Sequence, residues 1–109
     1  MAIYSGDIYA DTYTVSSSVT NVQIAADSGS MNVSGSIIPD AHNSHDLGSN
    51  SKRWANLYTA DLHLSNEGSE GNEVDGTTGN WTIQEGNDDL FIINRKTGKK
   101  FKFLLQEVT

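Results

Sequence analysis

The chain contains no cysteine, a single proline at Pro39, and few apolar residues, which make up 36% of its 109 residues. The absence of cysteine excludes disulfides, thiol catalysis and cysteine-based zinc sites. The apolar fraction is below the roughly 45–50% that is usual for globular domains, so a single copy has little material from which to build a core. We therefore expect partner chains to complete the fold.

The chain also lacks long apolar stretches and a basic face. No run is long enough to span a membrane, and no stretch has the 3.6-residue apolar period of an amphipathic helix. The first residues lack the positive and apolar regions of a signal peptide, so we expect synthesis in a cytoplasm and a soluble product. The net charge of −7 argues against nucleic-acid binding. Because no catalytic or phosphate-binding spacing occurs, we expect neither an enzyme nor a cofactor.

What the chain does contain is glycine and small polar residues between short alternating runs. Its ten glycines suit frequent turns. Period-2 alternation predicts strands at residues 7–15, 19–24, 31–38 and 56–64. In the last run, Leu62 and Leu64 share one face while His63 lies on the other. We predict an all-β fold in which short strands of several chains intertwine in a fibrous homo-oligomer.

Residues 81–109 have the clearest local pattern. Strand-like runs at 81–85, 90–95 and 100–105 are separated by turn sequences at 86–89 and 96–99, which predicts a three-stranded β-meander. A segment of this size cannot hold a core alone, so its large apolar side chains, together with Leu62 and Leu64, are candidates for a core or an oligomer interface. They are Phe91, Ile93, Phe101, Phe103 and Leu105.

Charge is unevenly distributed along the chain. Residues 61–89 contain eight acids and no base, and residues 66–80 have the composition of an acidic, glycine-rich loop or linker. Five of the seven basic residues lie near the C-terminus, either as a solvated hairpin face or as a contact for an acidic neighbouring subunit or a host structure. The candidate surface contacts are Trp81, Arg95, Lys96, Lys99 and Lys100.

Residues 37–58 carry a denser set of specific positions, with the pattern I-x-P-x-x-x-x-x-x-D-L-G-S-x-x-x-R-W-x-x-L-Y. The matching residues are Ile37, Pro39, Asp46, Leu47, Gly48, Ser49, Arg53, Trp54, Leu57 and Tyr58. This segment resembles a structural module common in phage tail-fibre and other virion proteins. The final residues, with the run NRKTGKKFKFLL, also resemble the terminus of virion structural proteins in some contractile-tailed phages.

The resemblance implies a virion component made in the host cytoplasm: a short fibre, a fibre segment or a head-decoration protein. Modules of this type are usually trimeric and attach to the particle by their N-terminal end. The expected partners are copies of the chain and other head or tail proteins. Two alternatives stay open: a receptor-binding adhesin that recognises a host-surface glycan or protein, and an assembly factor absent from finished particles.

Together with the composition, the resemblance divides the chain into four regions. Residues 1–36 are an N-terminal short-strand region that docks to the particle, and residues 37–65 are the fibre-type module. Residues 66–80 are the acidic loop or linker, and residues 81–109 are the meander.

The module residues also have plain structural interpretations. Asp46 can accept backbone N–H bonds at the head of a turn, and Gly48 permits the positive φ that such a turn needs. Trp54, Leu57 and Tyr58 have the spacing of a single helical turn, which would gather them in a buried cluster. We assign these three residues to the core or to the oligomer interface.

The module departs from its usual pattern at His45, where proteins that carry it often have an aromatic residue. With Asp40 and His42, this residue forms the pattern Asp-x-His-x-x-His-Asp, which has the donor types of a metal site. Histidines in loops more often bind nothing, so we predict no metal.

Overall fold

The computed structural model of the chain describes residues 29–109. The strands expected at residues 7–15 and 19–24, and most of the expected docking region 1–36, lie outside this range. The sheet belongs wholly to the unit Asp46–Thr109. Every regular element within the described range is a β-strand, so the prediction of an all-β fold is confirmed there. In the same range, no helix has the length and apolar character needed to cross a membrane.

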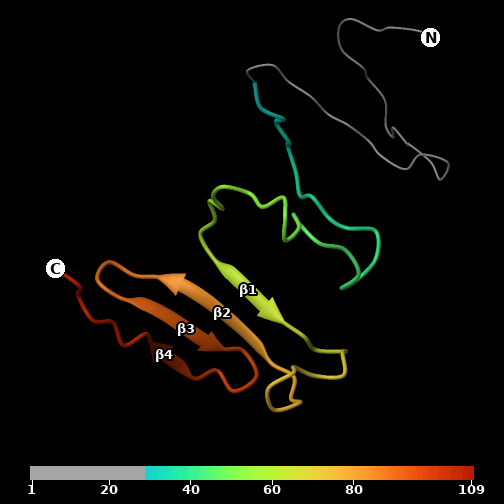
Figure 1. Cartoon of the computed structure of the whole chain (residues 1–109). Helices are drawn as coiled ribbons and strands as arrows, with labels where there is room; N and C mark the ends of the chain where they lie inside the picture. Colours follow the sequence, from blue (N-terminus) through green and yellow to red (C-terminus); the bar gives the residue numbers. More distant parts are fainter. Residues whose placement is uncertain (1–28) are drawn as a thin grey trace, which may run out of the picture. The chain divides into compact units, whose positions relative to one another are not determined.

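Four strands form one antiparallel sheet (Figure 1). They are β1 (Leu62–Ser65), β2 (Asn80–Glu85), β3 (Leu90–Asn94) and β4 (Lys100–Lys102), in the order β1-β2-β3-β4. The last three strands confirm the predicted meander. The sequence pattern did not indicate that β1 belongs to the same sheet, which it joins by pairing with β2.

Short turns bring β2, β3 and β4 together. Between β2 and β3, the amide of Gly86 donates to the carbonyl of Asp89 at 2.8 Å. Between β3 and β4, the amide of Gly98 donates to Asn94 O at 2.7 Å, and the amide of Lys96 donates to Asn94 Oδ1 at 3.0 Å. Gly98 has φ +76°, a conformation that glycine adopts without the steric cost of a Cβ. Both turns occur where the sequence predicted them.

The strand register divides the side chains between two faces. Residues that stand opposite one another across neighbouring strands share a face, as do residues two positions apart on one strand. One face, named the apolar face, carries Leu62, Leu64, Trp81, Ile83, Leu90, Ile92, Phe101 and Phe103, with the polar Glu85 and Asn94 at the strand ends. The other face, named the polar face, carries Asp61, His63, Thr82, Gln84, Phe91, Ile93, Arg95, Lys100 and Lys102.

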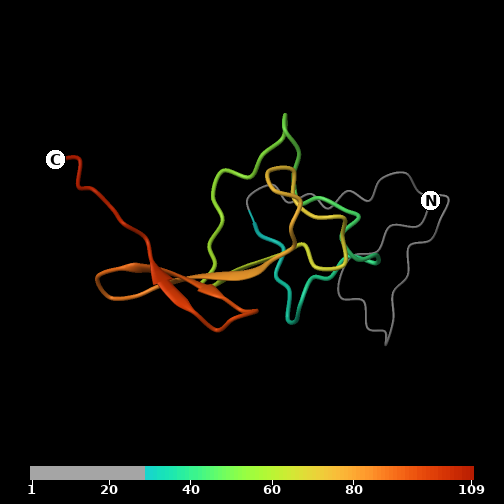
Figure 2. The ribbon, with the colours of Figure 1, turned by 90° about the horizontal axis from the view of Figure 1, so that it is seen from below.

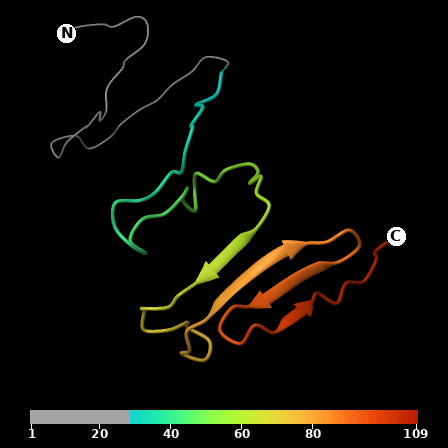
Figure 3. The same ribbon diagram turned by 180° about the vertical axis from the view of Figure 1, so that it is seen from behind.

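The sheet is a single layer, and no other described strand or helix is stacked on it (Figure 2). Among residues 29–109, only two side chains are buried: Thr82 at 0% exposure and Ile93 at 8%. Both lie on the polar face. Strands β1 and β4 form the two opposite edges, as the view from behind also shows (Figure 3). An apolar sheet face normally packs against another layer, so this sheet lacks its cover within the described range.

Three sequence predictions for earlier residues are wrong. Residues 31–38 form no strand, and the strand expected at 56–64 begins only at Leu62. Trp54, Leu57 and Tyr58 form no helical turn, and they are 69%, 68% and 92% exposed rather than buried within the chain. An alternating run becomes a strand only where a neighbour takes up its backbone hydrogen bonds, and no described residue does so here.

Candidate assembly surface

The apolar face presents side chains from all four strands. Leu62, Leu64 and Phe101 are 40%, 47% and 47% exposed. The rings of Trp81 on β2 and Phe101 on β4 meet across β3, with centroids 6.0 Å apart and planes tilted by 40°. Trp81, a candidate surface contact, is thus half-buried against a neighbour in its own sheet. Several large apolar side chains exposed together on one face of a sheet mark it as a candidate site for another layer or another protein surface.

The predicted interface residues do not all lie on this face. Phe101 and Phe103 do, whereas Phe91 and Ile93 lie on the polar face, because alternate residues of a strand point to opposite sides. Leu105 follows β4 and is 72% exposed. The apolar face has three further members that the sequence pattern did not indicate, namely Ile83, Leu90 and Ile92.

A group of hydrogen-bonded side chains crosses the polar face at Thr82. Arg95 Nε donates to Thr82 Oγ1 at 3.0 Å, and Thr82 Oγ1 lies 2.9 Å from His63 Nδ1. The Thr82 hydroxyl, which has one donor and two acceptor sites, can therefore bond to both side chains at once. Beside this group, Gln84 Nε2 donates to Asp61 Oδ2 at 3.2 Å. These bonds join β1, β2 and the end of β3, and they satisfy the buried hydroxyl.

The basic residues near the C-terminus do not form one free cluster. Arg95 donates to Thr82, and Lys96 Nζ donates to both O and Oγ1 of Thr78 at 3.0 Å. Two of the five basic side chains are therefore used within the chain. The other three are exposed, and they are Lys99, Lys100 and Lys102.

The D-L-G-S part of the module forms an exposed turn. Ser49 N donates to Lys52 O at 3.0 Å, and Lys52 N donates to Ser49 Oγ at 3.1 Å. Gly48 has φ +84°, which confirms the predicted positive φ, and a Cβ there would lie 3.4 Å from the Trp54 ring. Within residues 29–109, Asp46 accepts no hydrogen bond, so the side chain that closes this turn is Ser49 rather than Asp46.

The two histidines of the module do not converge on one point. His45 Nε2 lies 2.7 Å from Asp40 Oδ1, and both side chains are exposed. His42 is bonded through its backbone rather than its ring: the His42 carbonyl accepts a hydrogen bond from Ser44 Oγ at 3.0 Å. In the part of the chain that the structure covers, no group of three or more histidine, aspartate or glutamate side chains has the arrangement of a metal site.

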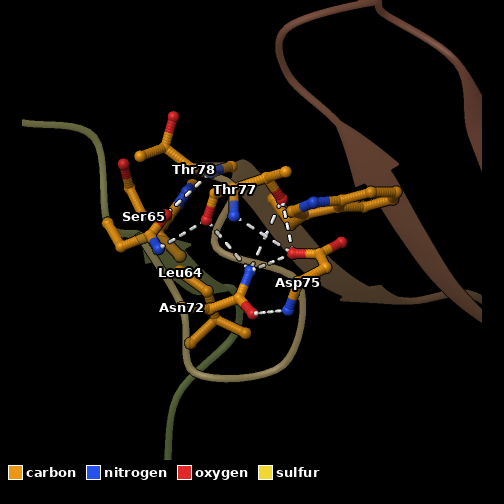
Figure 4. A pocket seen from close by; sticks show the side chains of 10 residues that line it. Leu64, Ser65, Asn72, Asp75, Thr77 and Thr78 are labelled. Atoms are coloured by element: carbon orange, nitrogen blue, oxygen red, sulfur yellow. Dashed lines mark hydrogen bonds between the residues drawn. The ribbon is translucent and has the colours of Figure 1, made fainter. Parts of the chain in front are cut away.

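Asparagine and aspartate side chains order the loop between β1 and β2 (Figure 4). At the base of the loop, Asn66 Oδ1 accepts from Gly79 N at 2.7 Å. At its tip, Asn72 Oδ1 accepts from Asp75 N at 2.9 Å, and Asp75 Oδ1 accepts from Asn72 Nδ2 and Thr77 Oγ1, both at 2.8 Å. The hydrogen bonds from Asn72 and Thr77 hold the pKa of the Asp75 carboxyl below its ordinary value. The segment with linker composition is an ordered loop within one sheet.

The sequence contained a partial signal for these residues. Asparagine and aspartate commonly bond to backbone groups two or three residues on, and the run from Asn72 to Gly76 has that composition. Alternation along β2 also places Thr82 on the side opposite to Trp81. Its burial had no local signal, because its hydroxyl is bonded by Arg95, which follows β3 and is 13 residues away in the sequence.

Comparisons with protein-family models, with curated proteins and with solved structures find no match to this chain. Two features of the chain itself bear on its function. These are the apolar face of the sheet and the module at residues 37–58.

Proposed function

We propose that the chain is a non-enzymatic structural component of a tailed-phage virion that works as a homo-oligomer. It serves as a short fibre, a fibre segment or a head-decoration protein. The apolar face carries the assembly part of this proposal, because within the unit Asp46–Thr109 no second layer of strand or helix packs on it. The resemblance of residues 37–58 to a fibre module supports the virion part and, with it, a trimer. The partners are copies of the chain and other head or tail proteins.

The apolar face is too small to form a protein–protein interface of standard size by itself. Four strands that are about 4.8 Å apart and roughly five residues long give it a projected area of about 300 Å². A standard interface buries about 800 Å² on each partner. The sheet face alone is therefore smaller than a standard interface. The exposed Trp54, Leu57 and Tyr58 side chains offer further apolar surface in the same unit, so we place them in the interface as well.

The mass of the purified chain in solution tests the homo-oligomer. Light scattering should give a multiple of 11.8 kDa, and three times that value for a trimer. Ile92→Lys puts a charge into the middle of the apolar face and should reduce the mass to one copy. The matched control is Phe91→Lys, because Phe91 is the neighbouring residue, is 37% exposed and lies on the polar face. A wild-type species of one copy that melts cooperatively at micromolar concentration contradicts the proposal.

Mass spectrometry of purified phage particles tests the virion assignment. A structural component is present at a fixed copy number in finished particles, and cryo-electron microscopy then locates it on the head or the tail. An assembly factor is absent from those particles. Absence from particles would remove the virion assignment while leaving the homo-oligomer in place.

A receptor-binding adhesin is the second candidate. The exposed Lys99, Lys100 and Lys102 favour it, because they present positive charge that no described acid neutralises. Arg95 and Lys96 are hydrogen-bonded within the chain, so three basic side chains rather than five are free for such a contact. Binding of the purified protein to host cells or a glycan array, with loss on Lys99→Ala combined with Lys100→Ala, would support the adhesin.

A further inference from the structure

In the described range, the two edge strands of the sheet have backbone hydrogen-bonding groups without partner strands. Among the described residues, β1 pairs only with β2, and β4 pairs only with β3. The outer sides of β1 and β4 therefore present backbone N–H and C=O groups without strand partners. Such edges are templates for pairing with another chain unless something covers them.

The direction of the strands makes these two edges compatible with each other. The sheet is antiparallel throughout and has four strands, so β1 and β4 run in opposite directions (Figures 1 and 3). If β4 of one copy lies beside β1 of a second copy, the antiparallel alternation continues without interruption. Every copy has one edge of each kind, so the same contact can repeat from copy to copy and close into a ring.

The two faces of the sheet also continue across such a contact. On the apolar face, Leu62 and Leu64 of one copy come beside Phe101 of the next. Leu62, Leu64 and Phe101 are among the exposed large apolar side chains of the sheet, so the contact covers what a single copy leaves open.

On the polar face, the two edges of the sheet carry opposite charges. Strand β4 carries Lys100 and Lys102 on this face, and both are exposed. Strand β1 carries His63 there, and it is preceded by Asp61, whose side chain is 39% exposed. Edge-to-edge contact brings the lysines of one copy to the acid of the next, and opposite charges side by side across a strand pair stabilise the pairing.

We propose that copies of this chain join edge to edge, with β4 of one copy pairing with β1 of the next, in a closed ring whose inner side is the apolar face. This arrangement rests on the proposed homo-oligomer and specifies how its subunits meet. Ring closure removes both free edges and turns the apolar face away from the outside of the assembly. The opposing interpretation is that Lys100 and Lys102 are edge charges that prevent strand pairing, and the experiments below separate the two.

Engineered cysteines test the contact directly, because the natural chain has none. Within one copy, β1 and β4 are separated by three strand spacings, about 14 Å, whereas the Cα atoms of a disulfide are at most about 7 Å apart. A disulfide between these strands must therefore join two copies. The variants are His63→Cys with Lys100→Cys and Ser65→Cys with Lys100→Cys. In the first variant His63 stands opposite Lys100 of the next copy, and in the second Ser65 does. The two registers differ by two residues, and in both of them the apolar face of one copy continues into the apolar face of the next.

Under mild oxidation, one of these two variants should give a reducible ladder of dimers and larger multiples on a denaturing gel. The control, Asn87→Cys with Lys100→Cys, has its first cysteine in the exposed turn between β2 and β3 and should give no such ladder. If the protein has the mass of several copies and neither variant cross-links above the control, the edge contact is wrong while the homo-oligomer stands. If the mass is that of one copy, both proposals fail.

Charge reversal provides an independent readout. Lys100→Glu combined with Lys102→Glu should raise the concentration at which the oligomer dissociates by about tenfold, and adding Asp61→Lys should restore much of the loss. Lys99→Glu is the control, because Lys99 lies in the turn before β4. If removing the charges with Lys100→Ala and Lys102→Ala instead causes open-ended aggregation, the lysines guard the edge and the proposal is overturned.

Discussion

Residues 31–38 and residues 90–94 are both short runs with several aliphatic side chains, but only the second run is a strand. Strand β3 (90–94) has β2 on one side and β4 on the other, and each neighbour is reached through a turn of a few residues. Residues 31–38 are followed by Pro39, and no described strand pairs with them. The difference shows that composition alone does not make a strand in this chain. A run becomes a strand where the fold places a partner strand beside it, through a short turn for β3 and β4 and through a long loop for β1.

The contrast extends to side-chain burial. Ile93, in the centre of the sheet, is 8% exposed, while Ile38 is 79% exposed. The same amino acid therefore contributes to packing in one region and faces solvent in the other.

Ile93→Ala should have the largest effect on the free energy of unfolding, a loss of about 2–3 kcal/mol, because it removes buried methylene groups and leaves a cavity. Ile38→Ala should change the stability by less than about 0.5 kcal/mol. Urea unfolding of the full chain, followed by far-ultraviolet circular dichroism, measures both. Equal losses at the two positions would mean that residues 31–38 are packed in the assembled protein.

Thr82→Val should cost about 1.5 kcal/mol, because it keeps the shape of the side chain but removes the hydroxyl that Arg95 and His63 share. Thr59→Val is the matched change at an exposed threonine outside the sheet. Thr59 is exposed, and its hydroxyl donates to Asp61 O at 3.0 Å. We expect a loss below about 0.5 kcal/mol there. If Thr82→Val unfolds at the same urea concentration as the wild type, the polar-face group does not stabilise the sheet.

Gly98→Ala should lower the stability of the sheet by about 1 kcal/mol, because alanine at φ +76° brings its Cβ into a strained position. Gly48→Ala imposes a similar strain at φ +84°, but in the exposed turn of the module. It should leave the thermal unfolding of the sheet unchanged. Gly98→Asn should recover part of the loss, since asparagine tolerates this conformation. An equal fall in melting temperature for Gly98→Ala and Gly48→Ala would show that the sheet and the turn of the module unfold together.

Acidification should have the smallest effect, confined to the loop between β1 and β2. The folded pKa of Asp75 is lowered from 3.8 by hydrogen bonds from Asn72 and Thr77. The stabilisation is therefore complete above pH 3.8 and is lost as the pH falls through the lower, folded pKa. The protection of the Asp75 and Thr77 amides against hydrogen exchange, relative to the intrinsic rate at each pH, should be unchanged at pH 5 and should fall only below pH 3.8. Asp75→Asn should show low protection of these amides at every pH.

Much of the meander was predictable because its determinants are local. The turn sequences 86–89 and 96–99 and the alternation of Phe101 and Phe103 with lysine all concern residues a few positions apart. The sequence did not predict which apolar side chains share a face. Phe91 and Ile93 lie on the face opposite to Phe101 and Phe103, although all four are candidates for one interface. Which faces coincide depends on the register between strands, and a pattern within one strand does not contain it.

Short-range patterns in the sequence were enough to predict the all-β class of the described region, the positions of β2, β3 and β4, and the positive φ at Gly48. Three features emerge only in the folded chain: β1 joins this sheet, Thr82 is buried, and apolar side chains from all four strands share one face. The pairing of Leu62 with Ile83 explains why: it spans a long, polar loop whose closure depends on Asn66 and Asn72 rather than on the strands it connects. Contacts at such separation depend on the whole arrangement of the chain, whereas turns and alternation are properties of neighbouring residues.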